Sequence, residues 1–323
     1  MLTEFQLLSV DLYPPPKEIF AGQFFRMDLS TTAGQKQLSH VVENEPIDAV
    51  VHLAFVIDPV QTRIIDEPRM WQANVAATEE LLKAISRRNC ESTQVQLFIF
   101  PSSVSAYGSP IDRVPEEAPL EGHTLPYAVH KREADLICQK LFPTLGGCAM
   151  YIYRPHIYAG ATVDNFILRS IRGRPSGRGL LAKAFDKFGW KVPALLPKSS
   201  EGGLLQFVHV DDVARVMLWT LHNFQQGQLK IFNLAGGGDP ISFGECVKMA
   251  GTPVLRVGSA KQILQLLKIF WALGLSGVSP NTIPYFLFPY TMDTTRLDRE
   301  LGAARKEILR YSTREAIQEA LHS

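Results

Sequence analysis

The stretch that decides the fold is Leu97-Phe-Ile-Phe-Pro-Ser-Ser-Val-Ser-Ala-Tyr-Gly108. Its four leading residues are apolar and strand-favouring, and a turn signal follows at once, which is typical of a buried strand. Such a strand delivers the hydroxyl of Ser103 to the point where the strand ends. Further along, Tyr127-Ala-Val-His-Lys131 places a phenol and an amine four residues apart, and therefore on one face of a helix. We expect these three side chains to belong to one site.

The three side chains suit alcohol and ketone chemistry on a nicotinamide cofactor. A charged Lys131 near the phenol favours the phenolate, so the pKa of Tyr127 is expected to fall below its usual value of about 10. Ser103 would hydrogen-bond the reacting oxygen while Tyr127 exchanges its proton and a hydride passes to or from the ring. The Tyr-x-x-x-Lys spacing alone is weak, because it also fits a packed ring beside a surface charge. Its place after the Ser-Ser turn and before Arg154-Pro155 favours catalysis.

Short apolar runs alternate with longer helical patterns through the first half of the chain. Strands are predicted at 5–10, 23–26, 49–54, 95–100 and 149–153, and helices at 31–42, 69–88 and 126–141. Helices of this length act as crossovers in a parallel sheet covered on both faces. The fold class predicted is therefore α/β, a Rossmann-like doubly wound parallel sheet. Residues 1–160 are assigned to this sheet domain, and residues 161–323 mostly to a smaller C-terminal α/β lobe, with some segments returning to the sheet.

Composition excludes several classes of protein. Thirty-three basic and thirty-two acidic residues give a net charge of +1, so no global field recruits nucleic acid. The four cysteines lie far apart without a C-x-x-C pair, which favours a reducing cytoplasm over a zinc site or a disulfide framework. The most apolar stretch, residues 263–275, is too short to span a bilayer. It is interpreted as an amphipathic or buried helix, with attachment to a membrane surface as the alternative.

Several motifs in combination resemble one family, the extended short-chain dehydrogenases/reductases, a group of NAD-dependent epimerases and dehydratases. The resemblance covers most of the chain. Its motifs are Asp28-Leu29, His52-Leu53-Ala54, Asn74-Val-Ala-Ala-Thr78, Ser102-Ser103-Val-Ser-Ala-Tyr107-Gly108, Tyr127-x-x-x-Lys131, Arg154-Pro155, Phe207-Val-His209-Val-Asp211-Asp212, and Asn233 in Phe-Asn-Leu.

The resemblance implies roles for individual residues. The catalytic residues would be Ser103, Tyr127 and Lys131. NAD would be bound by Asp28 and Leu29 at the adenine, by Leu53, Ala54 and Phe55 along the cofactor, by Asn74 near the nicotinamide, by Lys131 at the nicotinamide ribose, and by Pro155. Asn74 has an alternative interpretation as a helix N-cap. His209, Asp211 and Asp212 have the residue types of a metal site, but in this family the stretch looks structural, and no metal is expected.

Asp11 closes the first predicted strand, where the fold presents a carboxylate to the adenosine ribose diol. A 2′-phosphate would be repelled there, so NAD is favoured over NADP. The alternative interpretation of Asp11 is a solvated turn before Pro14-Pro15-Pro16.

The chain departs from the family at its beginning. The family starts with a strand and a Gly-x-x-Gly-x-x-Gly turn whose amides hold the pyrophosphate, and the sequence contains neither. The missing strand would lie between the strands predicted at 5–10 and 49–54. The expectation is that Met1 is an internal methionine of a product about 30 residues longer. Gly236-Gly237-Gly238 follows a late strand and is interpreted as an exposed turn.

The sequence also departs from the family at positions that contact the substrate. Nucleotide-sugar enzymes of the family commonly carry an Asn and an Arg where this chain has Ile157 and Leu205. Arginines that could compensate, or form a solvated helix face, are Arg169, Arg172, Arg174 and Arg178. Aromatic residues that either line a pocket for a less polar alcohol or pack in the core are Phe270, Trp271, Tyr285, Phe286, Phe288 and Tyr290.

Three functional hypotheses follow from these observations. The first is an NAD-dependent epimerase, dehydratase or dehydrogenase that oxidises the hydroxyl of a nucleotide sugar or related alcohol. The second is a non-catalytic relative that binds NAD or acts as a scaffold, favoured by the missing glycine-rich turn. The third is peripheral membrane association through residues 263–275. Family resemblance also implies a homodimer formed through the helices predicted at 69–88 and 126–141.

Overall fold

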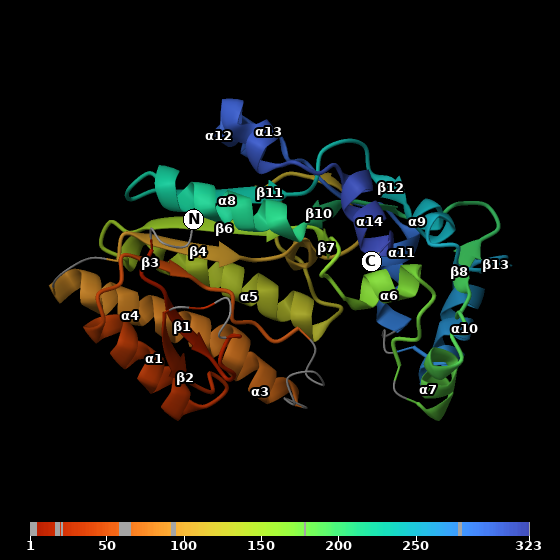
Figure 1. The fold of residues 1–323 in the computed structure, drawn as a ribbon, viewed down its shortest axis with the longest axis horizontal. Coiled ribbons are helices and arrows are strands. Elements are labelled where there is room, and N and C mark those ends of the chain that lie inside the picture. Colours follow the sequence, from red (N-terminus) through yellow and green to blue (C-terminus); the bar gives the residue numbers. More distant parts are fainter. Residues whose placement is uncertain are drawn as a thin grey trace. The chain divides into compact units, whose positions relative to one another are not determined.

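The computed structural model describes residues 5–16, 20, 22–57, 66–91, 95–177, 179–276 and 280–322 (Figure 1). The chain separates into two compact units. Unit 1 comprises Met1–Ser102, Val129–Ile152 and Phe224–Lys230, and unit 2 comprises Ser103–Ala128, Tyr153–Asn223 and Ile231–Ser323. Residues 103–128, which the sequence assigned to the sheet domain, therefore cluster with unit 2. The assignment of residues 161–323 to substrate binding stays a prediction.

A four-stranded sheet forms the centre of unit 1. Its order is β11 (Leu229–Leu234), β6 (Ala149–Pro155), β4 (Leu97–Pro101) and β3 (Ala49–Val51), and β6 and β11 continue into unit 2. The pair β3–β4 is parallel, with Ala49 opposite Leu97. Every residue of β4 and β6 is buried, as the continuous apolar sequence of β4 predicted. The α/β fold class with parallel sheets is confirmed.

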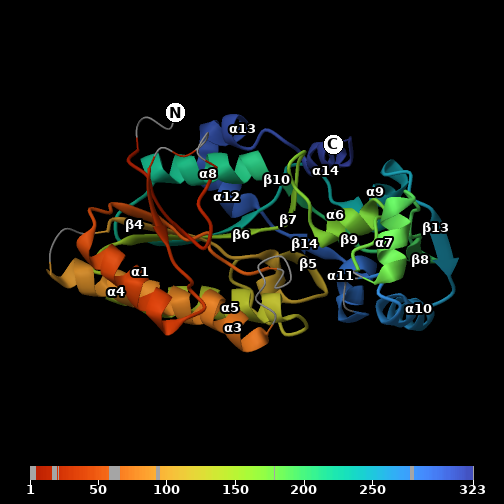
Figure 2. The ribbon, with the colours of Figure 1, turned by 60° about the horizontal axis from the view of Figure 1, so that its bottom comes forward.

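Helices of unit 1 cover one side of this sheet (Figure 2). They are α1 (Thr32–Asn44), α3 (Glu67–Trp71), η2 (Gln72–Ala76), α4 (Ala77–Glu91), α5 (Pro126–Leu141) and the short η4 (Phe142–Thr144). Thr31 caps α1 by accepting a hydrogen bond from the Gly34 amide. The single helix predicted at 69–88 is longer and contains one π-helical turn, η2. Its N-cap is Asp66, whose side chain accepts from the Arg69 amide.

The remaining strands of unit 1 form a separate pair. β1 (Leu8–Asp11) runs parallel to β2 (Gln23–Arg26), with Asp11 opposite Arg26. Within the described part of the chain, β1 is hydrogen-bonded only to β2, and β3 only to β4. One edge of β1 and one edge of β3 are thus left without a strand partner. These are the two strands between which the sequence predicted a missing strand, and that expectation stays a prediction.

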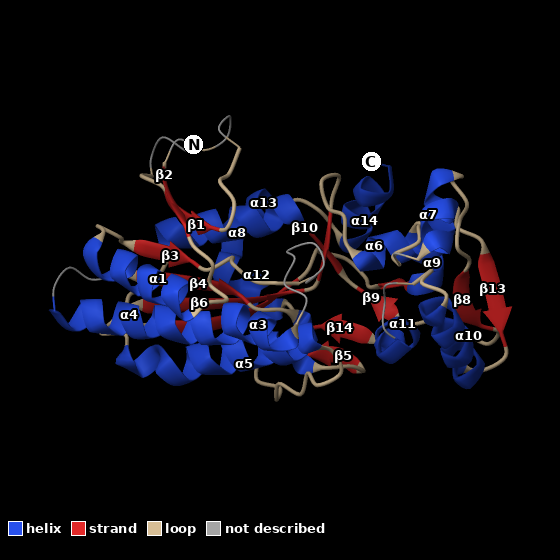
Figure 3. Cartoon of the chain, turned by 90° about the horizontal axis from the view of Figure 1, so that it is seen from below, coloured by secondary structure: helices blue, strands red, loops and turns tan. Residues whose placement is uncertain are grey.

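Unit 2 is built from short strands and helices around its own apolar core (Figure 3). Its strands form the sheets β10–β7, β12–β9–β14–β5 and β13–β8. The strands are β5 (Ile111–Val114), β7 (Ile157–Ala159), β8 (Ala194–Pro197), β9 (Leu204–Leu205), β10 (Phe207–His209), β12 (Ile241–Ser242), β13 (Val254–Val257) and β14 (Tyr290–Met292). The helices are η3 (Val104–Tyr107), α6 (Phe166–Ile171), α7 (Leu180–Lys187), α8 (Val210–Asn223), α9 (Phe243–Met249), α10 (Ala260–Ala272), η5 (Pro280–Thr282), α11 (Ile283–Leu287), α12 (Thr295–Leu301), η6 (Gly302–Ala304), α13 (Arg305–Ile308) and α14 (Thr313–His322).

A search of the described residues for membrane-spanning helices found none that is both long and apolar enough to cross a bilayer.

Candidate active site

Ser103 and Tyr127 meet within unit 2. The chain leaves β4, and Ser103 becomes the N-cap of η3 with an extended backbone. Its Oγ accepts hydrogen bonds from the Ser105 amide at 3.1 Å and from the Ser105 hydroxyl at 2.9 Å. The Tyr127 hydroxyl is hydrogen-bonded to the Ser103 side chain. The serine and tyrosine that the sequence placed in one site are therefore in direct contact.

Burial raises the pKa of Tyr127 above its ordinary value, and the hydrogen bond from Ser103 opposes this effect. The sequence predicted the opposite direction, on the ground that Lys131 would stabilise the phenolate. The difference arises because the free-energy cost of removing a phenolate from water is larger than the stabilisation that one hydrogen bond provides. Tyr158 and Tyr290 have a similar setting, since burial is the largest cause of their raised pKa values. It is followed by Tyr127 for Tyr158, and by Tyr285 and then Tyr127 for Tyr290. The resting form of Tyr127 is the neutral phenol, a proton donor.

Lys131 follows Tyr127 by one turn of α5 and is 5% exposed. Its Nζ donates a hydrogen bond of 2.6 Å to the Pro101 carbonyl at the end of β4. The same Nζ lies 3.7 Å from the centroid of the Phe55 ring. Burial lowers the pKa of Lys131 to about 7, although Cys138 and Asp135 act to raise it. Lys131 is therefore able to gain and lose a proton near neutral pH.

Asn74 holds the segment that follows β3. Its Oδ1 accepts from the Val56 amide at 2.6 Å, and its Nδ2 donates to the Val56 carbonyl at 3.0 Å. The same Nδ2 lies 3.2 Å from Nδ1 of His130 on α5. Asn74 is completely buried inside the helix and caps nothing, so the alternative interpretation as an N-cap is wrong. Since both backbone groups of Val56 are fixed, the preceding residues Leu53–Phe55 have a defined path.

His52 is a site residue that carried only a motif signal in the sequence. Its ring is 5% exposed, stacks on Phe100 with centroids 5.7 Å apart, and places Nε2 2.8 Å from the Thr78 hydroxyl. Burial, and next the charge on Lys131, lower the pKa of His52 to about 3. The imidazole is therefore neutral, and its role is to join β3 to α4.

Asp28 and Leu29 lie in the loop after β2, and Asp11 is the last residue of β1. Asp28 follows β2, and its Oδ1 accepts from the amide and the hydroxyl of Ser30 at 2.9 and 2.6 Å. Its Oδ2 lies 3.6 Å from the guanidinium of Arg69, a cation at this position that the sequence did not reveal. The Leu29 carbonyl accepts from Gln35 at 3.0 Å. Asp11 is exposed at the end of β1, with Oδ1 accepting from the Tyr13 amide at 3.1 Å.

The remaining predicted cofactor residues are the loop Leu53–Phe55 and Pro155. Leu53 is 61% exposed, whereas Ala54 and Phe55 are partly buried. Leu53, Ala54 and Phe55 form the loop that Asn74 fixes through Val56 and that meets Lys131 through the Phe55 ring. Pro155 ends β6 and belongs to unit 2.

Ser102, which the sequence analysis left without a role, follows Pro101 at the end of β4. Ser102 is 2% exposed, and its Oγ has no hydrogen-bond partner among the described residues. A buried hydroxyl without a partner costs about 1–3 kcal/mol, so a ligand that satisfies it is favoured. Lys131 has similar spare capacity, because its ammonium has three donors and, within the described residues, one hydrogen bond. Ser102 and Lys131 thus fit the hydroxyl groups of a ribose.

Arg154 anchors a buried polar network in unit 2. Its guanidinium donates to the Tyr107 hydroxyl at 2.7 Å and to the Glu116 carbonyl at 2.8 Å. Tyr107 in turn donates to Oδ1 of Asn233 at 2.8 Å, and Glu116 accepts from the Asn233 amide. The Tyr107, Arg154 and Asn233 motifs therefore serve to connect η3, β6 and β11.

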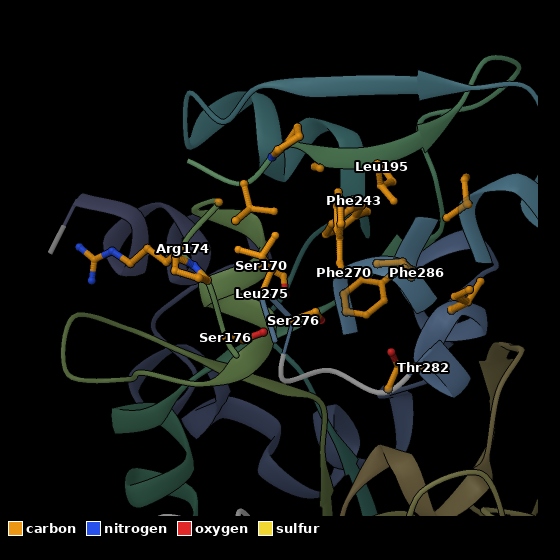
Figure 4. A pocket seen from close by; sticks show the side chains of 18 of the residues that line it. Ser170, Arg174, Ser176, Leu195, Phe243, Phe270, Leu275, Ser276, Thr282 and Phe286 are labelled. Atoms are coloured by element: carbon orange, nitrogen blue, oxygen red, sulfur yellow. The ribbon is translucent and has the colours of Figure 1, made fainter. Parts of the chain in front are cut away.

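A pocket in unit 2 has an apolar wall (Figure 4). Its cavity volume is about 100 Å³. Apolar residues of the lining include Leu195, Phe243, Ile263, Phe270, Ile283 and Phe286, and polar ones include Ser170, Arg174 and Thr282. The guanidinium of Arg174 points away from the other labelled side chains (Figure 4). The space suits a small apolar group and is well below the 300–1,000 Å³ typical of a complete ligand site.

For six aromatic residues the sequence allowed two interpretations, lining a pocket or packing in the core, and the structure shows both. Phe270 and Phe286 line the pocket, Tyr285 and Tyr290 are buried in the core, and Trp271 and Phe288 are each 46% exposed. Ile157 and Leu205, at 7% and 1% exposure, are core residues as well.

The arginines mostly have partners in the protein. Arg169 forms an ion pair with Asp164, and Arg172 donates to the Ala320 carbonyl. Arg178 lies outside the described residues.

The remaining motifs make contacts within unit 2. No group of three metal-ligating side chains occurs in the ranges that the structure describes. His209 stacks on Tyr311 with centroids 3.8 Å apart, and its Nε2 lies 3.2 Å from the Glu319 carboxylate. In the glycine turn, the Gly236 amide donates to the Phe207 carbonyl, and the Gly237 carbonyl accepts from the Thr313 amide.

Comparison with solved structures places the fold among sugar-nucleotide enzymes. UDP-glucose 4-epimerase from Bifidobacterium longum, in complex with NAD+ and UDP, gives a TM-score of 0.64 at 18% identity, covering 99% of this chain and 90% of that one. DesIV, a dTDP-glucose 4,6-dehydratase from Streptomyces venezuelae with NAD and TYD bound, gives 0.64 at 19% identity, covering 98% and 86%. MoeE5 in complex with UDP-glucuronic acid and NAD gives 0.61 at 22% identity, covering 98% and 88%.

At these identities the likeness concerns the fold. A search among curated proteins found no match. The family model of the NAD dependent epimerase/dehydratase family, however, matches residues 9–235. That span includes every candidate site residue and well over half of the sequence. The chain belongs to the NAD dependent epimerase/dehydratase family.

Proposed function

We propose that this protein is an NAD-dependent oxidoreductase of the epimerase or dehydratase type that oxidises a substrate hydroxyl through Ser103, Tyr127 and Lys131. The observation that carries the proposal is the hydrogen bond between Tyr127 and Ser103, on a helix that bears a buried Lys131 one turn further on. Family membership and NAD in the neighbouring structures support it. UDP-glucuronic acid in one of those neighbours and UDP in the other make a nucleotide sugar or related alcohol the first substrate class to test.

The residues near the end of β4 fit the ribose and nicotinamide end of NAD. The free hydroxyl of Ser102 and the donors of Lys131 match the ribose diol, and Leu53–Phe55 offers backbone groups along a fixed loop. When bound, NAD supplies the acceptor for the hydride that leaves the substrate carbon. The glycine-rich turn that holds the pyrophosphate in this family has no counterpart among residues 1–323.

Side chains of the protein carry out the proton transfer. Tyr127 acts as the base when it is ionised, accepting the hydroxyl proton while the carbon–oxygen bond becomes a carbonyl. Ser103 donates to the developing carbonyl oxygen and positions it. Reversal of the same steps, with Tyr127 returning the proton, reduces the ketone. Because the pKa of Tyr127 is raised, the oxidation rate should increase with pH, whereas ketone reduction uses the resting phenol.

The cofactor preference belongs to the same proposal. The exposed carboxylate of Asp11 at the end of β1 is suited to a ribose diol and repels a 2′-phosphate, which favours NAD over NADP. The homodimer, the cytoplasmic location and the individual cofactor contacts also stay predictions.

One observation favours a second candidate, a dehydrogenase or reductase of a less polar alcohol. Two positions that commonly carry polar residues in nucleotide-sugar enzymes are core residues here, Ile157 and Leu205, and the pocket of unit 2 is mainly apolar. The non-catalytic alternative is favoured by the missing glycine-rich turn and opposed by the Ser103–Tyr127 contact.

An oxidation assay tests the proposal. The protein is incubated with NAD and, in separate reactions, with UDP-hexoses, dTDP-glucose and apolar secondary alcohols. NADH absorbance at 340 nm and chromatography of the recovered sugar are the two readouts. We expect at least one substrate to yield NADH or an altered sugar. Absence of both products throughout the panel, from protein shown to bind NAD, would favour the non-catalytic alternative.

A further inference from the structure

Two helices of unit 2 bury few of their apolar side chains completely and leave several large ones exposed. In α7, of which every residue is described, the buried side chain is Ala182 alone, and in α10, also fully described, it is Ile263 alone. A surface helix of a globular protein normally buries a stripe along its whole length. The outer faces of α7 and α10 therefore lack a partner within the described chain.

The exposed side chains are large and partly aromatic. Leu180 is 85% exposed, Trp190 56% and Trp271 46%. We define the α7–α10 surface by its exposed large apolar residues, which are Leu180, Leu181, Phe188, Trp190, Ile269, Trp271 and Leu273. Trp190 stacks on Phe188 with ring centroids 5.1 Å apart, so these two aromatic rings are in contact. Single exposed apolar residues are normal, but an assembly of this size marks an interaction site.

The two segments that carry this surface adjoin each other. The Gly179 amide at the start of α7 donates to the Gly274 carbonyl just after α10, and the Gly177 amide donates to the Leu275 carbonyl. The strands β8 and β13, which follow α7 and precede α10, form a parallel pair. All four elements gather at the right-hand end of Figure 1. Leu180 and Leu273 thus extend from neighbouring backbone positions.

Charge in these segments is predominantly positive. Residues 172–200 and 251–290 contain ten lysines and arginines and a single acid, Asp186, although the whole chain carries a net charge of only +1. Four exposed lysines, Lys183, Lys187, Lys261 and Lys268, stand on α7 and α10 themselves. Within the described residues, no carboxylate forms an ion pair with any of these four lysines.

We propose that unit 2 binds the surface of an anionic phospholipid bilayer through the α7–α10 surface. Exposed tryptophans and leucines enter the boundary between headgroups and acyl chains, and lysines on the same helices pair with lipid phosphates. Tryptophan is enriched at this boundary because its ring is apolar and its N–H is polar. Charge complementarity selects this occupant, since a second copy of the chain would bring the same basic surface and be repelled. The proposal is independent of the catalytic one.

Flotation with lipid vesicles tests the proposal. The protein is mixed at low salt with vesicles of phosphatidylcholine alone or of equal parts phosphatidylcholine and phosphatidylglycerol, and the floated fraction is measured. We expect flotation with the anionic vesicles, little with the neutral ones, and a decline as salt is added. The double variants Trp190→Ser/Trp271→Ser and Lys183→Glu/Lys187→Glu should each weaken partitioning about tenfold or more.

Matched controls come from unit 1 and from α13. Tyr13→Ser removes another exposed aromatic ring, and Lys306→Glu reverses another exposed lysine. Both should float like the unmodified protein. Since all substituted residues are exposed, their melting curves should be unchanged. No flotation with anionic vesicles, or undiminished flotation of the two double variants, overturns the proposal. So does self-association, seen by ultracentrifugation without lipid, that the tryptophan variant abolishes.

Discussion

Replacement of Tyr127 by Phe is expected to lower kcat about 10²–10⁴-fold while lowering folding stability by only about 1 kcal/mol, the cost of one lost hydrogen bond. The phenol is the group that exchanges the substrate proton in the proposed reaction, and its ring is retained in the variant. The measurement is the initial rate of NADH formation, or of sugar conversion, with a substrate that the unmodified enzyme uses. NAD binding should persist, because the proposed cofactor contacts lie elsewhere.

The control for this variant is Tyr153→Phe. Tyr153 is also buried in unit 2, and its hydroxyl lies 2.6 Å from the Thr220 hydroxyl, so the variant loses a comparable hydrogen bond without touching the proposed site. Its kcat should stay within about twofold of the original, although its stability should fall by about 1 kcal/mol. A Tyr127→Phe enzyme that keeps full turnover would exclude Tyr127 as the acid and base.

Replacement of Lys131 by Met is expected to remove a pH dependence of folding stability. The pKa of Lys131 is about 7 in the folded protein, lowered by burial from 10.5. Between these values the unfolded chain holds a proton that the folded chain has released, so the free energy of unfolding rises with pH. The slope approaches about 1.4 kcal/mol per pH unit. Below pH 7 both states hold the proton, and the cost of burying the charge is fully present.

Urea unfolding of the nucleotide-free protein at several pH values between 6 and 9 checks this expectation. The Lys131→Met variant should be the more stable protein at pH 6, and its advantage should shrink as pH rises. Lys140→Met is the matched control, because Lys140 lies on the same helix α5 and is exposed. Its stability should follow the unmodified protein at every pH. Parallel curves for the Lys131 variant and the unmodified protein would show that Lys131 is not desolvated.

Sequence periodicity predicted the framework of the sheet because burial patterns are local. The strand predicted at 23–26 and the helix predicted at 126–141 are observed with those bounds. The strand predicted at 49–54 ends at Val51. Beyond it, the amide and carbonyl of Val56 are hydrogen-bonded to the side chain of Asn74 instead of to a neighbouring strand. A long-range contact of this kind leaves no signal in the local pattern. The same is true of the π-helical turn η2 that contains Asn74.

The sequence predicted which residues form the site, but it did not predict the direction of their pKa shifts. The order of Ser103, Tyr127 and Lys131 could be read from the sequence, and the contact between the first two is observed. The direction of the Tyr127 pKa could not, because it depends on how much water each group loses. Lys131 illustrates the same point, since its Nζ is enclosed by Phe55 and Pro101 from other segments. Likewise, residues 263–275 were recognised as amphipathic, but the exposure of Trp271 required the structure.

The most direct test of the account is a calorimetric titration of the 323-residue chain with NAD and, separately, with NADP. The account predicts NAD binding in the micromolar range and NADP binding about tenfold weaker or more, a difference of about 1.4 kcal/mol. Asp11→Asn should narrow that difference. No heat of NAD binding from folded protein, or tighter binding of NADP, would contradict the claim that this chain carries an NAD site.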